Sequence, residues 1–203
     1  MTGAGHSHNP EYPDDSWNLY AMLDTNLTTA LNAINSTDAL GVFKPFARRL
    51  ETNPQLISDA DEELMIVAQF TSPVHIRKIM IIGGGENDKH PSQLKCYVNK
   101  DNIDFSSVQS LTPSQAFNLP VNSDGTVELM TVLRPFTNVN SVVFFFPANH
   151  GGGDQTIIKY IGMQGEHTHY RRIAVDAVYE VLCNGQDLEC HDDELGAQAQ
   201  HMH

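Results

Sequence analysis

The sequence lacks most of the motifs on which catalytic and redox proteins depend. Its 203 residues include three cysteines, Cys96, Cys183 and Cys190, and no C-x-x-C pair. This pattern argues against a disulfide scaffold, a thioredoxin-type redox centre and a zinc ribbon. A G-x-S-x-G elbow, a P-loop and a G-x-G-x-x-G fingerprint are also missing, so serine-hydrolase and nucleotide-binding functions lack their usual signals. We therefore predict no catalytic residues, no bound metal and no cofactor.

Positive charge is also scarce. Twelve Lys and Arg residues face 25 Asp and Glu, for a net charge of −13, which disfavours nucleic acid and anionic membranes as partners. The first 15 residues contain no apolar signal-peptide core, and the longest apolar stretch, Val142 to Pro147, is too short to span a bilayer. We therefore expect a soluble intracellular protein that is cytoplasmic, with a nuclear pool left open.

Composition divides the chain into one domain and two tails. Residues 1–15 are rich in Gly, His, Ser, Asn, Pro and Asp, have little to bury and are expected to be a disordered tail. Residues 16–182 form the predicted domain. Residues 183–203 are expected to be a flexible acidic tail, because five carboxylates there face no Lys or Arg: Asp187, Glu189, Asp192, Asp193 and Glu194.

The hydrophobic pattern predicts a short helix followed by many strands. Apolar residues from Trp17 to Ile34 recur every three or four positions, as in an amphipathic helix. From Glu63 onward the period is two, and Ser72-Pro73 is expected to turn the chain. The predicted strands cover 64–70, 74–82, 94–98, 127–133 after an Asp124-Gly125 turn, 141–146, 157–163 and 173–181. Many short strands with long links favour an all-β antiparallel jelly-roll β-sandwich with a short N-terminal helix.

Five sequence blocks, in this order along the chain, carry a family resemblance. They are Gly41 to Phe46, Ser58 to Leu64, His90-Pro91-Ser92 leading into Lys95 to Asn99, Pro135 to Val139, and Tyr160 to Glu166. Together they resemble the PITH domain, which follows the thioredoxin domain in thioredoxin-like proteins and also occurs alone. The resemblance implies a galactose-binding-domain-like β-sandwich and a protein-interaction module that associates with the 26S proteasome. It implies no redox activity, because the thioredoxin domain is absent.

Two glycine-rich loops, each next to a strongly apolar run, are candidate binding elements. The first, Gly83 to Ser92, carries Asp88 and His90, and the second, His150 to Asp154, carries a His and an Asp at its two ends. If both loops lie at one end of the sandwich, these four side chains could line a binding rim. The alternative function is therefore a jelly-roll protein that binds a small ligand, a carbohydrate or a metal through the loop histidines.

A metal site of the cupin type is a weaker hypothesis. His167-Thr168-His169 resembles the H-x-H pair of cupins, but Tyr170-Arg171-Arg172 follows where a carboxylate ligand would be needed. A surface turn is the interpretation that we favour.

An acidic run is the main candidate for protein docking. Asp59, Asp61, Glu62 and Glu63 lie within five residues and could form either a solvated lead-in to a strand or a docking edge for a basic partner. The chain's two basic pairs, Arg48-Arg49 and Arg171-Arg172, could neutralise this run or bind acidic groups of a partner. We favour the intramolecular role slightly, and we expect a monomer.

Overall fold

The computed structural model describes residues 17–100 and 102–167, except for the side chains of residues 37 and 38. Both predicted tails, the predicted strand 173–181, Cys183 and Cys190 lie outside the described residues. The described part contains eight strands: β1 (Thr29–Leu31), β2 (Leu56–Ile57), β3 (Leu64–Gly83), β4 (Gln93–Val98), β5 (Gln115–Asn118), β6 (Leu129–Met130), β7 (Val139–Phe146) and β8 (Ile157–His167).

The helices among the described residues are all short. One is α-helical, α1 (Phe105–Val108), and begins with a capping box in which Asp104 accepts a hydrogen bond from the Ser107 N–H. The others are 3₁₀ helices, labelled η: η1 (Leu19–Met22), η2 (Ser36–Val42), η3 (Phe46–Arg48) and η4 (Asn87–Lys89). The all-β class predicted from the sequence is confirmed.

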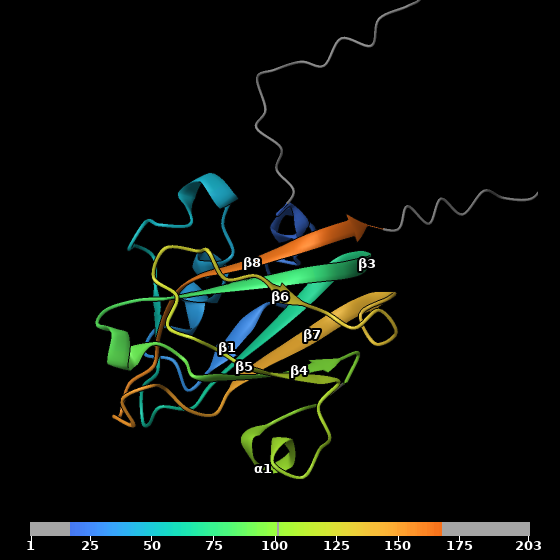
Figure 1. The fold of residues 1–203 in the computed structure, drawn as a ribbon. Coiled ribbons are helices and arrows are strands. Elements are labelled where there is room, and N and C mark those ends of the chain that lie inside the picture. Colours follow the sequence, from blue (N-terminus) through green and yellow to red (C-terminus); the bar gives the residue numbers. More distant parts are fainter. Residues whose placement is uncertain (1–16, 101, 168–203) are drawn as a thin grey trace, which may run out of the picture. The chain divides into compact units, whose positions relative to one another are not determined.

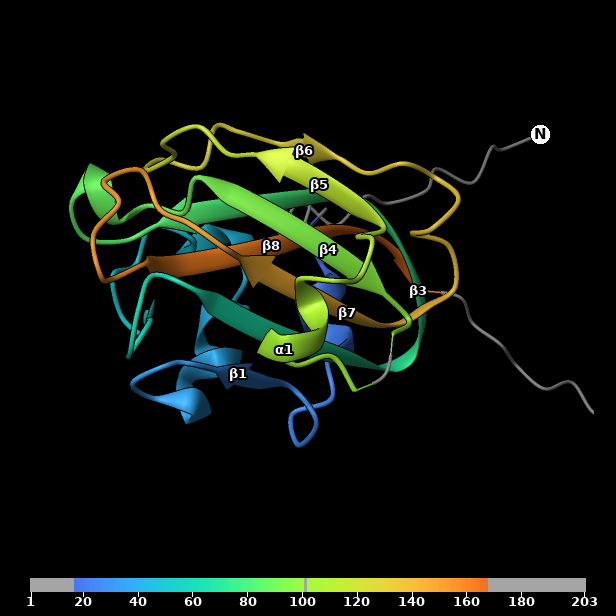
Figure 2. The ribbon, with the colours of Figure 1, turned by 90° about the horizontal axis from the view of Figure 1, so that it is seen from below.

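Strand β3 joins the two layers of the sandwich. Its first part, to Gln69, pairs antiparallel with β1 and β7, and β7 continues through β4 to the edge strand β5. Its second part, from Val74 onward, pairs with β8 and β6, and β8 pairs with β2. Figures 1 and 2 show β3 crossing beside strands of both groups. All pairings are antiparallel, as the sequence pattern predicts.

The predicted turn at Ser72-Pro73 is wrong. The chain remains a strand through these residues, and only the register with β7 shifts, between Gln69 and Val74. A proline is tolerated where strand pairing is already interrupted, because its missing N–H then costs no ladder hydrogen bond. The two strands predicted at 64–70 and 74–82 are therefore one bent strand.

A second irregularity in β3 keeps its apolar residues in the core. The register with β8 shifts between Ile76 and Lys78, as in a β-bulge. Before it, alternate residues such as Leu64 and Ile66 face the core, and after it the inward positions have odd numbers, such as Ile79 and Ile81. Because one extra residue inverts the alternation, a strict period of two cannot predict this face along the whole strand.

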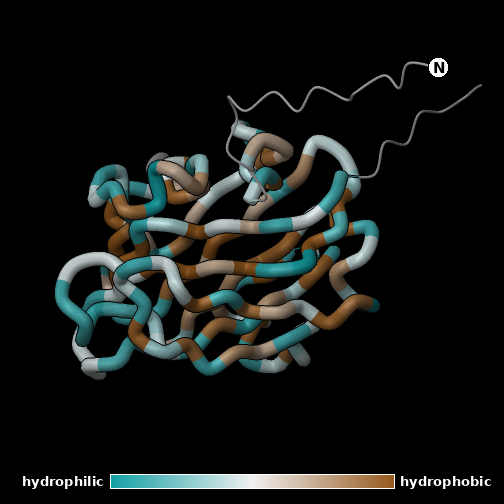
Figure 3. The backbone as a smooth tube through the Cα atoms, turned by 45° about the horizontal axis from the view of Figure 1, so that its top comes forward, coloured by the Kyte–Doolittle hydropathy of each residue, from teal (hydrophilic) through white to brown (hydrophobic). Residues whose placement is uncertain are grey.

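The core lies between the layers, and two smaller apolar clusters cover their outer faces. The central cluster includes Cys96, whose complete burial raises the pKa of its thiol and supports the packing role expected from its alternation with Leu94 and Val98. A second cluster packs α1 against β4 and β7, and a third packs Trp17 against β3 and β8. Hydrophobic residues accordingly concentrate along the strands (Figure 3).

The amphipathic helix predicted between Trp17 and Ile34 does not form. Residues Leu19–Met22 make a single 3₁₀ turn, and Thr29–Leu31 form strand β1 on the edge of β3. Leu27 and Ile34, expected on the apolar face of a helix, are both 51% exposed. Pairing with the edge of β3 outweighs a weak helical pattern, because most of the stability of a helix in a protein comes from its tertiary packing.

The two open sides of the sandwich are bridged by hydrogen bonds. On one side, the chain after β1 meets the chain after β2, where Ala33 pairs with Ser58 and the Ile34 N–H donates to the Ile57 carbonyl. On the other side, the Gln115 side chain of β5 donates to the Met130 carbonyl and accepts from the Val132 N–H, at 3.0 and 2.8 Å. These contacts fix the edges that carry the loops.

Candidate functional site

The two glycine-rich loops lie side by side at one end of the sandwich. The Gly151 N–H donates to the Asp88 carbonyl at 2.7 Å, and the His150 N–H donates to the His90 carbonyl at 3.0 Å. Pro91 and Asn149 form an isolated antiparallel bridge next to these bonds. The loops therefore form one backbone-linked unit, as the rim hypothesis requires.

This unit borders an open recess of about 460 Å³. Asp88 and Asp154 come from the two glycine-rich loops, and Asp59 comes from the start of the acidic run. All three residues are exposed, and their carboxylates form no ion pair with any residue that the structure describes. Lys89 is the only cationic side chain among the described residues that line the recess. The remaining lining residues are Ala60, Asn149, Gly153 and Gln155.

The predicted rim is wrong in one of its members, His90. Its side chain is 2% exposed and packs against Gly83, whereas His150 is exposed. Burial lowers the pKa of His90, and the nearby charges of Lys159 and His150 lower it further, while Asp88 opposes them. The two loop histidines therefore do not form a ligand pair. Among residues 17–100 and 102–167, no group of His, Cys, Asp and Glu side chains is arranged to hold a metal ion.

The acidic run is fixed in place by Asn32. The Nδ2 of Asn32 donates to Asp61 Oδ1 at 2.7 Å and to the Glu63 carbonyl at 2.6 Å, while its Oδ1 accepts from the Ala60 N–H at 2.9 Å. Asn32 adopts a φ of +56°, a conformation that asparagine tolerates better than most residues. The run is therefore an ordered turn rather than a loosely solvated segment.

The carboxylates of the run differ in their surroundings. Asp59 and Asp61 are exposed, whereas Glu62 and Glu63 are half-buried. Partial burial raises the pKa of Glu63, and the negative charges of Asp61 and Glu62 raise it further, against a smaller opposing effect of Lys95. The negative charge of the acidic run is therefore not neutralised by neighbouring side chains, and it would attract a cation that approaches the run.

The basic pair Arg48-Arg49 does not neutralise the acidic run. Arg48 instead forms an ion pair with Glu51, with its Nη2 2.8 Å from Oε2. Arg49 stacks on Phe46, with its guanidinium carbon 4.0 Å from the ring centroid. The neutralisation of the acidic run that we favoured is therefore wrong for Arg48, because its ion-pair partner Glu51 lies outside the run. Arg171, Arg172 and His169 lie outside the described residues.

Sequence reasoning missed two residues that shape the site. Asn149 is 7% exposed, and its Nδ2 donates to the carbonyls of Gly153 and Gln155, which holds the second glycine-rich loop closed. Asn32 holds the acidic run from a position 27 residues before Asp59. Neither asparagine belongs to a motif, and only the tendency of asparagine to occupy turns gave a weak signal.

The comparison with known proteins decides the family. The PITH domain matches residues 9–182. The chain belongs to the PITH domain family. Human PITH domain-containing protein 1 is 33% identical over 183 residues, which cover 90% of this chain and 85% of that protein. The protein of the same name from Dictyostelium discoideum is 33% identical over 186 residues, covering 91% and 90% of the two chains.

A solved structure shares the β-sandwich fold of this chain. The structure of the CBM32-1, CBM32-2 and M60 catalytic domains of Clostridium perfringens ZmpB aligns with a TM-score of 0.54 at 13% identity. The alignment covers 79% of this chain and 17% of that one. At this identity the likeness concerns the fold alone. None of the helices that the structure describes is long and apolar enough to cross a membrane.

Proposed function

We propose that this PITH domain is a non-enzymatic protein-interaction module that docks onto the 26S proteasome. The docking edge is the acidic edge of the recess, formed by Asp59, Asp88 and Asp154. Membership of the PITH family supports an interaction role. The choice of surface rests on one observation: Asp59, Asp88 and Asp154, from three separate segments, converge on one recess without a paired cation among the described residues. A surface of one charge sign favours fast association with a partner of opposite sign.

The geometry of this edge favours recognition over chemistry. Its backbone is held in place by the hydrogen bonds between the glycine-rich loops and by the Asn32 contacts, so little ordering entropy is lost on binding. Among the described residues, no group of His, Cys, Asp and Glu side chains is arranged to hold a metal ion. A basic loop or terminus on the partner is the complementary surface.

The proposal is tested by capturing assembled proteasomes with the purified full-length chain at low and moderate salt. We expect capture at low salt that weakens as ionic strength rises, because surface charges are screened beyond about 10 Å at 0.1 M salt. The test variant neutralises the three recess carboxylates, with the substitutions Asp59→Asn, Asp88→Asn and Asp154→Asn.

A control with matched charge separates the recess from the net charge. Three exposed residues near α1 and β5, none of which lines the recess, are replaced to add three positive charges: Gln109→Lys, Thr112→Lys and Ala116→Lys. Each set of three substitutions changes the net charge of −13 by +3, to −10. We expect the recess variant to lose capture and the control to retain it. Equal loss in both would refute the recess as the docking edge, and no capture by the unmodified chain would refute proteasome association.

A further inference from the structure

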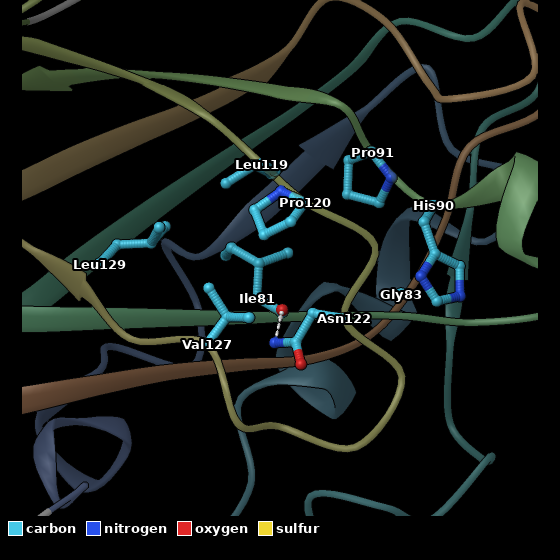
Figure 4. Close-up of a pocket in the computed structure, with 9 residues that line it drawn as sticks. All are labelled: Ile81, Gly83, His90, Pro91, Leu119, Pro120, Asn122, Val127 and Leu129. Atoms are coloured by element: carbon cyan, nitrogen blue, oxygen red, sulfur yellow. Dashed lines mark hydrogen bonds between the residues drawn. The ribbon is translucent and has the colours of Figure 1, made fainter.

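An open groove of about 500 Å³ lies between strand β1 and helix η2, and we call it the β1 groove. All three residues of β1 line it, together with Ser36 and Leu40 on the η2 side and Thr25 and Thr28 before the strand. Within the described part of the chain β1 pairs only with β3, and Figure 2 shows it at the margin of the sandwich. The apolar cavity beside His90 (Figure 4) has a volume of only about 10 Å³, so it cannot admit a side chain.

Exposed apolar side chains gather around the β1 groove. Leu31 lines it and is 38% exposed. Leu27 and Ile34 are each 51% exposed and lie within two residues of the lining residues Thr28 and Ser36. One short segment therefore concentrates apolar surface at the edge of the sandwich. Contiguous exposed apolar surface of this kind is typical of an interaction site, whereas isolated exposed leucines are not.

The polar groups of the groove suit a peptide backbone. The side chains of Thr25, Thr29 and Ser36 form no hydrogen bond with any residue that the structure describes. Each hydroxyl can both donate and accept, so it matches the N–H and the C=O groups of an extended chain. No aromatic ring is among the described lining residues, so a sugar would find no stacking platform. The groove thus offers apolar contact to one side chain and hydrogen bonds to a backbone.

The acidic run lies at the end of β1 and sets the charge of the partner. Asn32, the residue after Leu31, donates from Nδ2 to Asp61 Oδ1 at 2.7 Å. Asp61 is exposed and forms no ion pair with any residue that the structure describes. The pKa of Glu63 is raised by burial and by the charges of Asp61 and Glu62. A cation next to the groove would reduce this repulsion, so the complementary segment is basic beside its apolar residue.

We propose that the β1 groove binds an extended segment of a partner protein in which an aliphatic residue is followed by Arg or Lys. The aliphatic side chain packs against Leu31 and Leu40, and the cation pairs with Asp61. No residue that lines the β1 groove also lines the acidic recess of the proposed docking edge. This binding site is therefore independent of proteasome association.

The test is a titration of the ¹⁵N-labelled full-length chain with the synthetic peptide acetyl-Gly-Ser-Leu-Arg-Lys-Gly-amide, followed by the NMR shifts of the backbone amides. We expect saturable shifts at Thr29, Leu31 and Ser36. A peptide with Ser in place of Leu should bind roughly tenfold more weakly or worse, because the burial of an aliphatic side chain is lost. This second peptide keeps the charge, so it separates recognition by the groove from general attraction to an acidic protein.

Two blocking variants locate the binding surface. Thr29→Arg places a long cationic side chain in the groove, and Thr112→Arg makes the same change at an exposed threonine outside it. We expect the first variant to raise the Kd of the leucine peptide at least tenfold and the control to leave it unchanged. Ser36→Arg is the second blocking variant, in case Thr29→Arg disturbs β1. Circular dichroism shows whether each variant is folded.

Asp61→Asn tests the cation, because it keeps Oδ1 as the acceptor for Asn32 and removes only the charge. The Kd should rise roughly twofold to fivefold, as expected for an exposed ion pair. An unchanged Kd would overturn the assigned charge of the partner. The binding site itself is refuted if the groove amides do not shift, if the serine peptide binds equally well, or if both blocking variants bind like the control.

Discussion

The backbone of Gly83 lies directly against the imidazole ring of His90. A Cβ placed on Gly83 would overlap Cγ, Cδ2 and Nδ1 of that ring. The last residue of β3 must therefore be glycine for His90 to be buried beneath the loop. This close approach explains why His90 points into the protein while the neighbouring Asp88 lines the recess.

Replacing Gly83 with alanine should destabilise the domain by about 1–3 kcal/mol, because overpacking displaces the His90 ring. Urea denaturation followed by circular dichroism measures the change. Gly153→Ala is the control, since a Cβ at Gly153 meets nothing within 4 Å, and it should change stability by less than about 0.5 kcal/mol. Equal effects of the two substitutions would contradict the packing argument.

His90 should make the domain less stable in mild acid. Burial holds its pKa in the folded state below the ordinary value of 6.5, so the unfolded chain binds this proton more readily. The stabilising effect of the neutral ring is therefore complete above about pH 6.5, and it is lost as the pH falls from there toward the folded-state pKa.

Denaturation measured between pH 8 and pH 5 tests this dependence. Subtracting the profile of His90→Phe from that of the unmodified chain removes the contributions of the other nine histidines. We expect the free energy of unfolding of the unmodified chain, relative to that of His90→Phe, to decrease as the pH falls. A flat difference across this range would show that His90 titrates alike in the folded and unfolded chains.

Gln115→Ala should lower the free energy of unfolding by about 1–2 kcal/mol, because the two hydrogen bonds to the Met130 carbonyl and the Val132 N–H are lost together. Gln93→Ala, on the neighbouring strand β4, is a matched control, since Gln93 is exposed and its side chain forms no hydrogen bond to any residue that the structure describes. Chemical denaturation of both variants is the measurement. If Gln115→Ala and the control have the same free energy of unfolding, the bridge between β5 and β6 contributes nothing to stability.

Two substitutions at Asn32 should separate the hydrogen bonds of the acidic run from its backbone conformation. Asn32→Gly keeps the positive φ but loses the three side-chain bonds, at a cost of about 1–3 kcal/mol. Asn32→Ala also strains the backbone and should cost about 1 kcal/mol more. Denaturation profiles give both values, and equal stability of the two variants would mean that the left-handed conformation adds no strain.

The parts of the fold that depend on local alternation were predictable from the sequence. Strands β4, β7 and β8 agree with the apolar pattern around Cys96, Phe144 and Ile161, because the pairing register is continuous along the stretch that contains each of these residues. The bulge near Arg77 and the uninterrupted course through Pro73 were not predictable, since both depend on which distant strands pair with β3. Tertiary pairing decides such features.

The candidate site was predictable in composition but not in arrangement. Asp59, Asp88 and Asp154 were all singled out by their sequence surroundings, yet only the folded chain brings the three segments to one recess. The prediction that His90 lies on the exposed rim was wrong, because no local pattern reveals that its ring packs against Gly83 in the interior. The partners of Arg48 and Asn32 likewise follow from geometry at sites without a motif.

The 20-residue length of β3 also bears on how the protein folds. Because the same strand supplies a central member to each layer, neither half of the sandwich is complete without it. Its pairing partners in β7 and β8 lie 65 to 93 residues later in the sequence, so the ends of long loops must meet before the strand is stabilised. Such distant pairings slow folding, and they make unfolding a single cooperative event rather than the stepwise release of two sheets.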